Sequence, residues 1–564
     1  MATNLLPDLG DMARLSYRES FARAVAEHRR RPLVLPYGLL GPMVLAPIWL
    51  AIPHTKRPWI YRSRWLIVGL VVALDLDMVF SMSSHNVACA YGAGLMAMWG
   101  ILTTLDLLVW SRPQFNAARA ILVPMSVYAG KISNGTAKAS GEGIDVKLAH
   151  YDGLRQRKLD LVATSGLHVA SNTSSSDGKP RLDRPQYDNP QQDDPQHENQ
   201  PDCIWQPFPE DAPFLQRLNW AMDFVTNYRC IGWNCSISSV PLPQIPTRIH
   251  LGDPVTLDGM PVVSRSGYRR SLSKSEFLWT RVWTVVVLYL VLDFLAVFMM
   301  KDPYFIFGPD QNSGHELPEF LRRLPSWVLL TYRQLFSLAG IFAAIGAIFN
   351  LHDIFQYFVF SLVFPIRGEL WQYTTTFGSF SQVLNRGLAG WWGSWWHQTF
   401  RLQFSSPASY LVRNSYLSRG TLATQIVTML VSFFQSGLLH ASGSQSSMPK
   451  TKLWRAPAFF LLQPPGIIIQ QALNWAIDTY LPHVPIMVRR AFNTVSTLAW
   501  LQLTARFFCD DIASTGLWLL EPIPLSPLRL LGFGHPNDHW WRWTWDMFPV
   551  WHSGDNWWAS GLQI

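Results

Sequence analysis

Cysteine is scarce in this sequence. Its 564 residues include five cysteines, which are too few and too widely spaced for a framework of disulfide bonds. Cys230 and Cys235 lie close together, but no partnering cluster of cysteine or histidine residues accompanies them, as a structural zinc site would require. We therefore expect neither a disulfide framework nor a bound metal ion in this protein.

The sequence also lacks the features of a nucleic-acid-binding protein. Its formal net charge is +8, yet no run of lysine and arginine is interleaved with aromatic residues. The basic residues instead lie beside hydrophobic runs, as in HRRRP and HTKRPWIYRSR. Such flanking charge, together with 27 tryptophans, is typical of a membrane protein, because indole rings and cationic side chains favour the headgroup region. We expect a lipid bilayer, and no nucleic acid, as a partner.

The N-terminal segment does not read as a cleavable signal peptide. Residues 1–32 are charged and carry an amphipathic pattern in MARLSYRESFARAVAEHRRR, where a signal peptide would have an apolar centre. We expect a short helix at the membrane surface.

Long apolar runs are abundant. A helix needs about 20 apolar residues to cross a bilayer. Runs of this kind occupy residues 33–51, 65–82, 87–110, 277–300, 327–349, 422–440, 457–480 and 492–520. A shorter run, 354–363, is either a tilted span or a buried segment. The pattern predicts an all-α, polytopic membrane protein with about eight to nine transmembrane helices and re-entrant segments.

A polar insert interrupts the apolar runs. It covers residues 111–276 and separates N-terminal transmembrane helices over 33–110 from a transmembrane core over 277–564. Within it, residues 170–202 are rich in Pro, Gln, Asp and Asn and cannot bury enough apolar surface to offset chain entropy, so we expect disorder there. Three glycosylation sequons lie in the insert, at Asn134, Asn172 and Asn234. They favour a luminal insert only weakly, and its orientation in the membrane stays open.

A polar stripe runs along residues 422–440. It consists of residues at intervals of four, namely Thr424, Thr428, Ser432, Ser436 and His440, which share one face of a helix. Lipid would leave these side chains without hydrogen-bond partners, so we expect the stripe to face the bundle interior or a hydrated cavity. His440 ends the stripe near a predicted membrane boundary. It is therefore either a functional group or a structural histidine at the interface.

A second histidine lies in GWWGSWWHQTFR, residues 390–401. This segment is too short to span a bilayer and predicts a re-entrant or interfacial helix, with His397 and Arg401 on one face. Two histidines without further ligands do not make a metal site, and FQSGLL lacks the G-x-S-x-G pattern of a nucleophilic serine. The remaining catalytic role is that of a general base acting on a substrate hydroxyl, with the acyl group supplied by an activated thioester.

Several segments resemble a known family. FLQRLNWAMDFVTNYRCIGWNC, residues 214–235, resembles the R-x-x-W-A-x-x-x…R-G-I-G-W segment of fungal wax-synthase-like proteins of the membrane-bound O-acyltransferase superfamily. WWGSWWHQTFR resembles their F-W-G-R-x-W-H-Q block, and FFQSGLLH their F-x-x-S-G-x-x-H block. DDIASTGLWLLEPIPLSPLRLLGFG and WHSGDNWWASGLQI are similar to later segments of the same proteins. Two residues depart from these blocks: Ser394 stands where arginine is frequent, and Cys230 where glycine is usual.

The resemblance implies a helical acyltransferase fold and assigns roles by position. His440 matches the superfamily histidine that acts as general base, and His397 matches a second site that assists the same chemistry. The further residues expected to contact the substrates are Trp395, Trp396, Gln398, Arg401 and Ser436. Arg386 and Arg413, with Arg401, are expected to bind the phosphates of acyl-CoA, or else are ordinary juxtamembrane charge.

The resemblance also implies substrates. Fungal proteins of this kind often acetylate a hydroxyl of a terpenoid or meroterpenoid secondary metabolite. We therefore expect acetyl-CoA as co-substrate, no bound cofactor or metal, a hydrophobic alcohol as acceptor, and a location in the endoplasmic reticulum. One alternative keeps the chemistry but makes wax esters from long-chain acyl-CoA and fatty alcohols. Another is a non-enzymatic transporter with an ion path along Asp75, Asp77 and Asp106, although the sequence has no internal repeat to support it.

Overall fold

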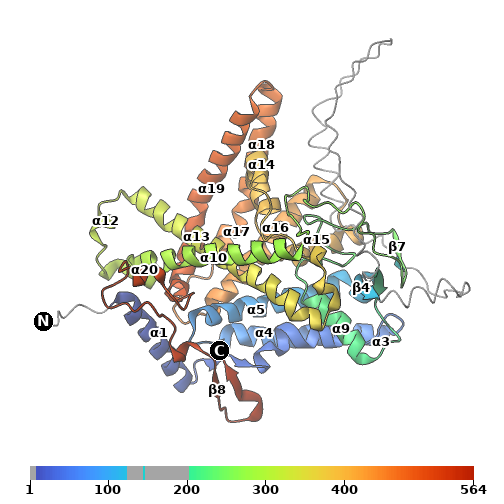
Figure 1. The fold of residues 1–564 in the computed structure, drawn as a ribbon, viewed down its shortest axis with the longest axis horizontal. Helices are drawn as coiled ribbons and strands as arrows, with labels where there is room; N and C mark the ends of the chain where they lie inside the picture. Colours follow the sequence, from blue (N-terminus) through green and yellow to red (C-terminus); the bar gives the residue numbers. More distant parts are fainter. Residues whose placement is uncertain (1–7, 124–143, 146–201) are drawn as a thin grey trace, which may run out of the picture.

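The computed structural model describes residues 8–123, 144–145 and 202–564. Over these residues the fold is mostly helical, and its strands form small sheets of two or three members (Figure 1). The predicted disorder over 170–202, Asp202 excepted, lies outside the described residues, as do the sequons at Asn134 and Asn172.

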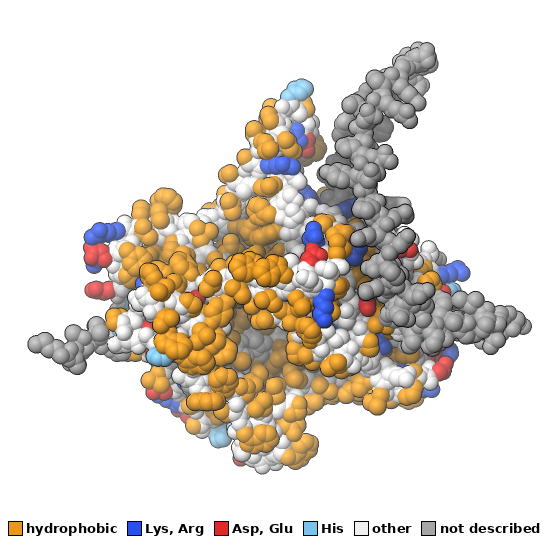
Figure 2. Space-filling view, viewed as in Figure 1, with side chains coloured by type: hydrophobic (Ala, Val, Ile, Leu, Met, Phe, Trp, Pro, Cys, Tyr) orange, Lys and Arg blue, Asp and Glu red, His pale blue; other side chains and the backbone are white. Residues whose placement is uncertain are grey.

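Four helices of the described chain are long and apolar enough to cross a membrane. They are α5 (Val87–Leu105) with its continuation η3 (Asp106–Ser111), α10 (Lys274–Met299), α13 (Ser326–Phe358) with its extension to Leu362, and α16 (Leu422–Ser446). α10 packs along α13, and α16 packs along α5. Figure 2 shows hydrophobic side chains over much of the visible face, and Trp279, Trp283 and Leu290 of α10 are among the exposed ones. The count of eight to nine spans stays a prediction.

Several predicted runs are divided differently in the structure. Runs 327–349 and 354–363 form one continuous helix, because no glycine or proline signal separates them. Run 33–51 becomes strand β2 (Val34–Leu35) and one short apolar helix, Tyr37–Leu50, made of η1 (Tyr37–Leu39), the π-helix η2 (Leu40–Leu45) and α2 (Ala46–Leu50). Run 457–480 is split into α17 (Arg455–Leu461) and α18 (Gln463–Tyr480), with prolines in the first turn of α18, where their missing N–H groups cost no hydrogen bond. α18 and α19 (Ile486–Ser514) stand together at the top of Figure 1.

The N-terminal segment folds onto the core. The predicted amphipathic helix is α1 (Leu9–Ala26), and it buries Tyr17, Phe21 and Ala24 while Leu15 stays exposed. α3 (Pro58–Arg62) and α4 (Arg64–Ser81) follow, and α4 packs against α5. Asp75 and Asp106 are buried among protein atoms, as expected for carboxyl groups in apolar helices.

The polar insert contributes to the main core. Strand β4 (Ala118–Val123) pairs antiparallel with β6 (Asp202–Pro207), and β5 (Ile144–Asp145) pairs with β7 (Arg248–Ile249). α9 (Phe214–Val225) and the loop after it bury Trp220 and Trp233 completely, against Trp205 of β6 and the N-terminal helices. The sequon at Asn234 is not accessible, because this side chain is buried and hydrogen-bonds the backbone of Asn116 and Ala118. Cys230 has φ 49°, a left-handed conformation that glycine adopts more easily, at the position where the resembled R-G-I-G-W block has glycine.

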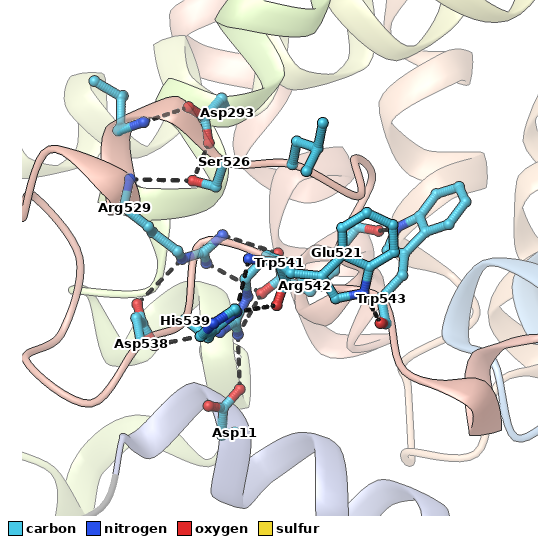
Figure 3. A network of polar contacts seen from close by, with 12 residues as sticks. Asp11, Asp293, Glu521, Ser526, Arg529, Asp538, His539, Trp541, Arg542 and Trp543 are labelled. Carbon is cyan, nitrogen blue, oxygen red and sulfur yellow. Dashed lines mark hydrogen bonds and ion pairs between the residues drawn. The ribbon is translucent and has the colours of Figure 1, made fainter.

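The two ends of the chain meet in a buried ionic network, shown in Figure 3. Glu521 accepts a bidentate ion pair from Arg529 of α20 (Pro527–Leu530) at 3.0 and 3.1 Å, with both side chains about 1% exposed. Arg542 bridges Glu521 to Asp11 of α1, at 2.9 Å to each. The sheet of β2 (Val34–Leu35), β9 (Gly561–Gln563) and β8 (Val550–His552) ties the same ends together, and β1 (Arg31–Pro32) pairs with β3 (Met82–Ser83). The segment EPIPLSPLR thus closes the N-terminal helix onto the bundle.

Candidate active site

Both predicted histidines line one cavity. It has a volume of about 2440 Å³, and His440 and His397 both contribute to its wall. α13, α16, α18 and α19 supply much of the lining, and α5, α10, α14 (Ser381–Gly390), α15 (Arg401–Arg413) and α17 add to it. The volume exceeds that of a usual small-molecule site, which is about 300–1,000 Å³. The cavity has room for two substrates together.

α16 forms a polar side of this cavity. All five residues of the predicted stripe line it, which confirms that the stripe faces the bundle interior. α16 does not end at His440, as the hydropathy suggested, but continues to Ser446. Gly94 of α5 allows this part of α16 to come close, and its N–H donates to the hydroxyl of Ser446 at 2.9 Å. His440 is therefore held within a helix that packs tightly on its neighbour.

Three aromatic side chains hold the imidazole of His440. Its Nδ1 atom lies 2.9 Å from the hydroxyl oxygen of Tyr91 in α5. Phe460 stacks on one face at a centroid distance of 5.1 Å and an interplanar angle of 9°, and Phe508 meets the ring edge-on at 4.9 Å. Nε2 has no hydrogen-bond partner among the described residues. The ring is thus fixed in orientation, with Nε2 left for a substrate.

His397 lies in a turn, and the prediction that it shares a helix face with Arg401 is wrong. The π-helix η9 (Trp391–Trp395) ends at Trp396, whose backbone is extended, and α15 begins only at Arg401. Burial, helped by the positive charge of Arg229 and by His440, lowers the pKa of His397 to about 3, so the imidazole is neutral. Its Nδ1 atom is buried without a hydrogen-bond partner in the described structure.

Gln398 builds this turn. Its side-chain NH₂ donates to the carbonyl oxygens of Trp392 and Trp396 at 3.0 and 2.7 Å, and its Oε1 accepts from Arg401 at 2.9 Å. Both amide protons are therefore committed to the backbone. Gln398, a residue expected to contact the substrates, lines the cavity, but its side-chain NH₂ has no free proton to donate to an oxyanion.

The other predicted contact residues fall into two groups. Trp396, Arg401, Ser436 and Arg386 line the cavity together with the two histidines. Trp395 and Arg413 do not: Trp395 packs on Phe377 and Phe380, and Arg413 donates to the carbonyl oxygen of Trp110. Ser394, the residue that replaces a frequent arginine, accepts a hydrogen bond from Arg386 at 3.2 Å.

The insert reaches the site through Arg229. Its guanidinium donates to the Thr374 hydroxyl at 3.1 Å and to the carbonyl oxygens of Thr375 and Thr376 at 3.0 and 2.8 Å. The charge of Arg229 acts on His397. The R-C-I-G-W segment, which lies far from His397 in sequence, therefore supports the turn region beside it.

The cavity differs in character along its length. One end is polar and is lined by Asn385, Arg386, Asn474, Asp478 and Arg490. Another part is lined by aliphatic side chains of α13, of which Leu335 and Ile348 are 58% and 62% exposed. The wall of the cavity is therefore apolar along α13.

Sequence reasoning missed Tyr91. In CAYGAGLMA it is one tyrosine in an apolar helix, and nothing in the pattern separates it from a packing residue. It also missed Arg490 and Asn474, which reach the cavity only because α18 and α19 pack beside α14.

The fold and cavity define a class of protein. Among the described residues, the side chains close enough to share a metal ion are Asp8, Asp11 and Asp538, and neither histidine belongs to that group. Long apolar helices enclose an oriented imidazole whose Nε2 faces a large internal cavity. These are the features of a membrane-embedded protein whose chemistry takes place in an internal cavity.

Known proteins agree with this class. The sequence profile of the membrane bound O-acyl transferase family matches residues 373–462, the segment with both histidines. The acetyltransferase aurG of Calcarisporium arbuscula is 23% identical over 444 residues, which cover 76% of this chain and 95% of aurG. The O-mevalon transferase yanI of Aspergillus niger is 24% identical over 254 residues, or 42% of this chain and 48% of yanI. The acetyltransferase ple2 of Rhodocybe pseudopiperita is 23% identical over 292 residues, or 52% of this chain and 65% of ple2.

No solved structure matches the chain. The sequence comparisons agree with the resemblance seen in the histidine blocks: residues 373–462 are similar to the membrane bound O-acyl transferase family, and the named relatives support an acyltransferase enzyme.

Proposed function

We propose that this protein transfers an acetyl group from acetyl-CoA to a hydroxyl of a hydrophobic, terpenoid-type secondary metabolite. The observation that carries the proposal is the pair of histidines on one large cavity within the segment matched by the family profile. Relatives named acetyltransferases favour acetyl as the group transferred. The terpenoid class of acceptor rests on the resemblance to fungal secondary-metabolite enzymes, and we propose the endoplasmic reticulum as the location on the same ground.

His440 is the proposed general base. Nε2 takes the proton of the acceptor hydroxyl, and the oxygen attacks the carbonyl carbon of the thioester. A C–O bond forms, the C–S bond breaks, and CoA leaves as a thiolate that takes the proton back from Nε2. The imidazole ends the cycle neutral and ready for another acceptor.

His397 is proposed to assist at the acyl oxygen. As a neutral ring it carries one N–H, which can donate to the carbonyl oxygen as negative charge develops there. Trp396, Arg401 and Ser436 line the same cavity and are proposed to contact the substrates. We do not extend that role to Trp395, which lies outside the cavity lining.

The two ends of the cavity suit different substrates. The polar end, with Arg386 and Arg490, is proposed to receive the phosphates of acetyl-CoA, because guanidinium groups bind phosphates well. The aliphatic part at α13 is proposed to admit the acceptor from the bilayer. Arg413 lies outside the cavity lining and does not enter this proposal.

Wax ester synthesis is the second candidate, because a cavity of about 2440 Å³ also has room for long acyl chains. A transporter without catalysis is not retained, since the chain is an acyltransferase and Asp75 and Asp106 do not line the cavity.

Labelled acyl donors test the proposal. Microsomes that express the protein are incubated with a terpenoid alcohol and either acetyl-CoA or palmitoyl-CoA, and both ester products and free CoA thiol are measured. We expect acetyl esters in large excess, and none above background with the His440→Ala variant. His483→Ala, at an exposed histidine outside the cavity, is the matched control and retains activity. A strong preference for palmitoyl-CoA with a fatty alcohol contradicts the acetyl assignment.

A further inference from the structure

The hydrogen bond between His440 and Tyr91 constrains the tautomer of the proposed base. The neutral imidazole carries one proton, on Nδ1 or on Nε2. If the tyrosine donates to Nδ1, the ring proton lies on Nε2, which then has no lone pair for a substrate proton. Only the arrangement in which Nδ1–H donates to the Tyr91 hydroxyl, 2.9 Å away, leaves Nε2 able to act as a base.

In that arrangement the Tyr91 O–H needs an acceptor of its own. The hydroxyl has no other hydrogen-bond partner among the described residues, and the side chain is only 5% exposed. A buried donor without a partner costs free energy, because it loses its hydrogen bond to water and gains none in return. The site must therefore supply an acceptor nearby.

Asp511 of α19 is the group that meets this need. It is fully buried, its Oδ2 accepts from Ser444 of α16 at 2.6 Å, and its Oδ1 is buried without a partner. Asp511 lies close enough to Tyr91 for its charge to act on the phenol. Ser444 follows His440 by one helical turn, so one turn of α16 carries both the imidazole and the hydroxyl that hydrogen-bonds Asp511.

We propose that Asp511 and Tyr91 form a relay to Nδ1 of His440, which fixes the base in its reactive tautomer and stabilises the imidazolium formed during acyl transfer. The proposal rests on the function proposed above. Tyr91 and Asp511 are positioning residues, because they act through His440 and not on the substrates.

The protons balance along the relay. The substrate proton arrives on Nε2, while Nδ1–H donates to the Tyr91 oxygen. Oδ1 of Asp511 has no hydrogen-bond partner in the described structure, and the relay closes when the Tyr91 O–H turns to donate to it. The positive charge on the ring then has a carboxylate at the end of the relay. When the CoA thiolate leaves, the Nε2 proton moves to sulfur and the relay returns to its starting state.

Other titratable groups around the ring do not replace this relay. The groups that face the His440–Tyr91–Asp511 cluster are His397 from the turn after η9, Cys509 from α19 and Arg455 from α17. His397 is neutral, and Arg455, which is paired with Asp310, favours the ionised form of Asp511. Asp511 is the acidic group of this cluster that, when ionised, favours a charged His440.

Tyr91→Phe and Asp511→Asn test the relay in the full-length protein in nanodiscs. Both keep the shape of the side chain, and CoA thiol release is followed from pH 5 to pH 9. For Tyr91→Phe we expect kcat to fall about tenfold to a hundredfold with KM for acetyl-CoA unchanged. We also expect the rising limb of the pH profile to move to lower pH by about one unit, because the imidazolium loses its acceptor. Asp511→Asn should move the limb in the same direction.

Tyr304→Phe is a matched control. Tyr304 is 4% exposed and bonds Asp510 at 2.9 Å, so it is a similar buried tyrosine–aspartate pair that does not line the cavity. This variant should lose stability without any shift in the pH profile. The double variant Tyr91→Phe/Asp511→Asn should be as active as the more impaired of the two single variants, because both changes break the same path.

Three results overturn the relay: an unchanged kcat in Tyr91→Phe, a fall in kcat without a pH shift, or independent, multiplying losses in the double variant. His440→Ala is measured in parallel. If it is inactive while Tyr91→Phe is normal, the relay alone is wrong; if it is active, the proposed function is wrong as well.

Discussion

Gly94→Ala tests how closely α5 must approach α16 for the active site to form. A Cβ atom at this position would lie 1.9 Å from the backbone oxygen of Ser442 and 2.5 Å from the hydroxyl of Ser446. Because the nearest atom belongs to helix backbone, no side-chain rotation relieves the clash. The two helices must move apart by about 1 Å to accept the methyl group.

The effect on stability follows from two opposing contributions. Overpacking a close contact costs about 1–3 kcal/mol, while replacing glycine by alanine within a helix gains about 1 kcal/mol. We expect the free energy of unfolding to fall by about 1–2 kcal/mol. The lost hydrogen bond from the Gly94 N–H to Ser446 adds to the fall.

The effect on activity follows from the position of Tyr91, one turn before Gly94 in α5. A separation of about 1 Å breaks the 2.9 Å bond from His440 to Tyr91. A hydrogen bond from the imidazolium is worth about 1.5–3 kcal/mol, and hence about tenfold to a hundredfold in kcat. The assay is CoA thiol release by the purified protein in nanodiscs, with thermal unfolding measured on the same sample. Gly69→Ala on α4 is the control, since its Cβ meets no atom within 4 Å. If Gly94→Ala matches Gly69→Ala in both measurements, the reasoning about close helix packing is refuted.

Two further predictions concern the cavity lining. Arg386→Gln should raise KM for acetyl-CoA about tenfold in steady-state kinetics, whereas Arg413→Gln should leave KM unchanged. Of these two arginines, Arg386 lines the cavity and Arg413 does not. Equal changes in KM would contradict the proposed role of Arg386 in binding the phosphates. His397→Gln should make the stability of the fold less sensitive to acid. The pKa of His397 is about 3 in the folded protein and ordinarily 6.5, so between these values the unfolded chain binds a proton that the folded chain does not. The free energy of unfolding of the wild type therefore falls as the pH drops below 6.5. Melting temperatures from pH 7 to pH 4 should fall less steeply in the variant, and parallel curves would count against a buried neutral histidine.

The sequence was sufficient to predict the polar face of α16, because a four-residue spacing of hydroxyl groups in an apolar helix has one physical solution, a face turned away from lipid. It also predicted both histidines of the cavity. It did not predict the turn at His397, since tryptophan-rich segments fit a helix equally well until Gln398 and its two carbonyl partners are placed. Tyr91 could not be predicted either, because its role depends on where α5 meets α16.

Helix boundaries depend on similar contacts between distant segments. α16 continues past His440 because Ser444 and Ser446 find partners on α19 and α5, which hydropathy does not register. From sequence, the segment EPIPLSPLR is informative only through its resemblance to a family segment. In the structure its first and last residues, Glu521 and Arg529, form a buried ion pair that sequence spacing alone does not predict.

The central claim is that His440 acts as the base of an acyl transfer within the cavity. Its most direct test is the rate of acceptor-dependent CoA thiol release by purified protein in nanodiscs, for the wild type and for His440→Ala at equal amounts of folded protein. A general base contributes about 10²–10⁴ in rate, so the variant should lose at least a hundredfold while it still unfolds cooperatively. Turnover within about twofold of the wild type would contradict the account.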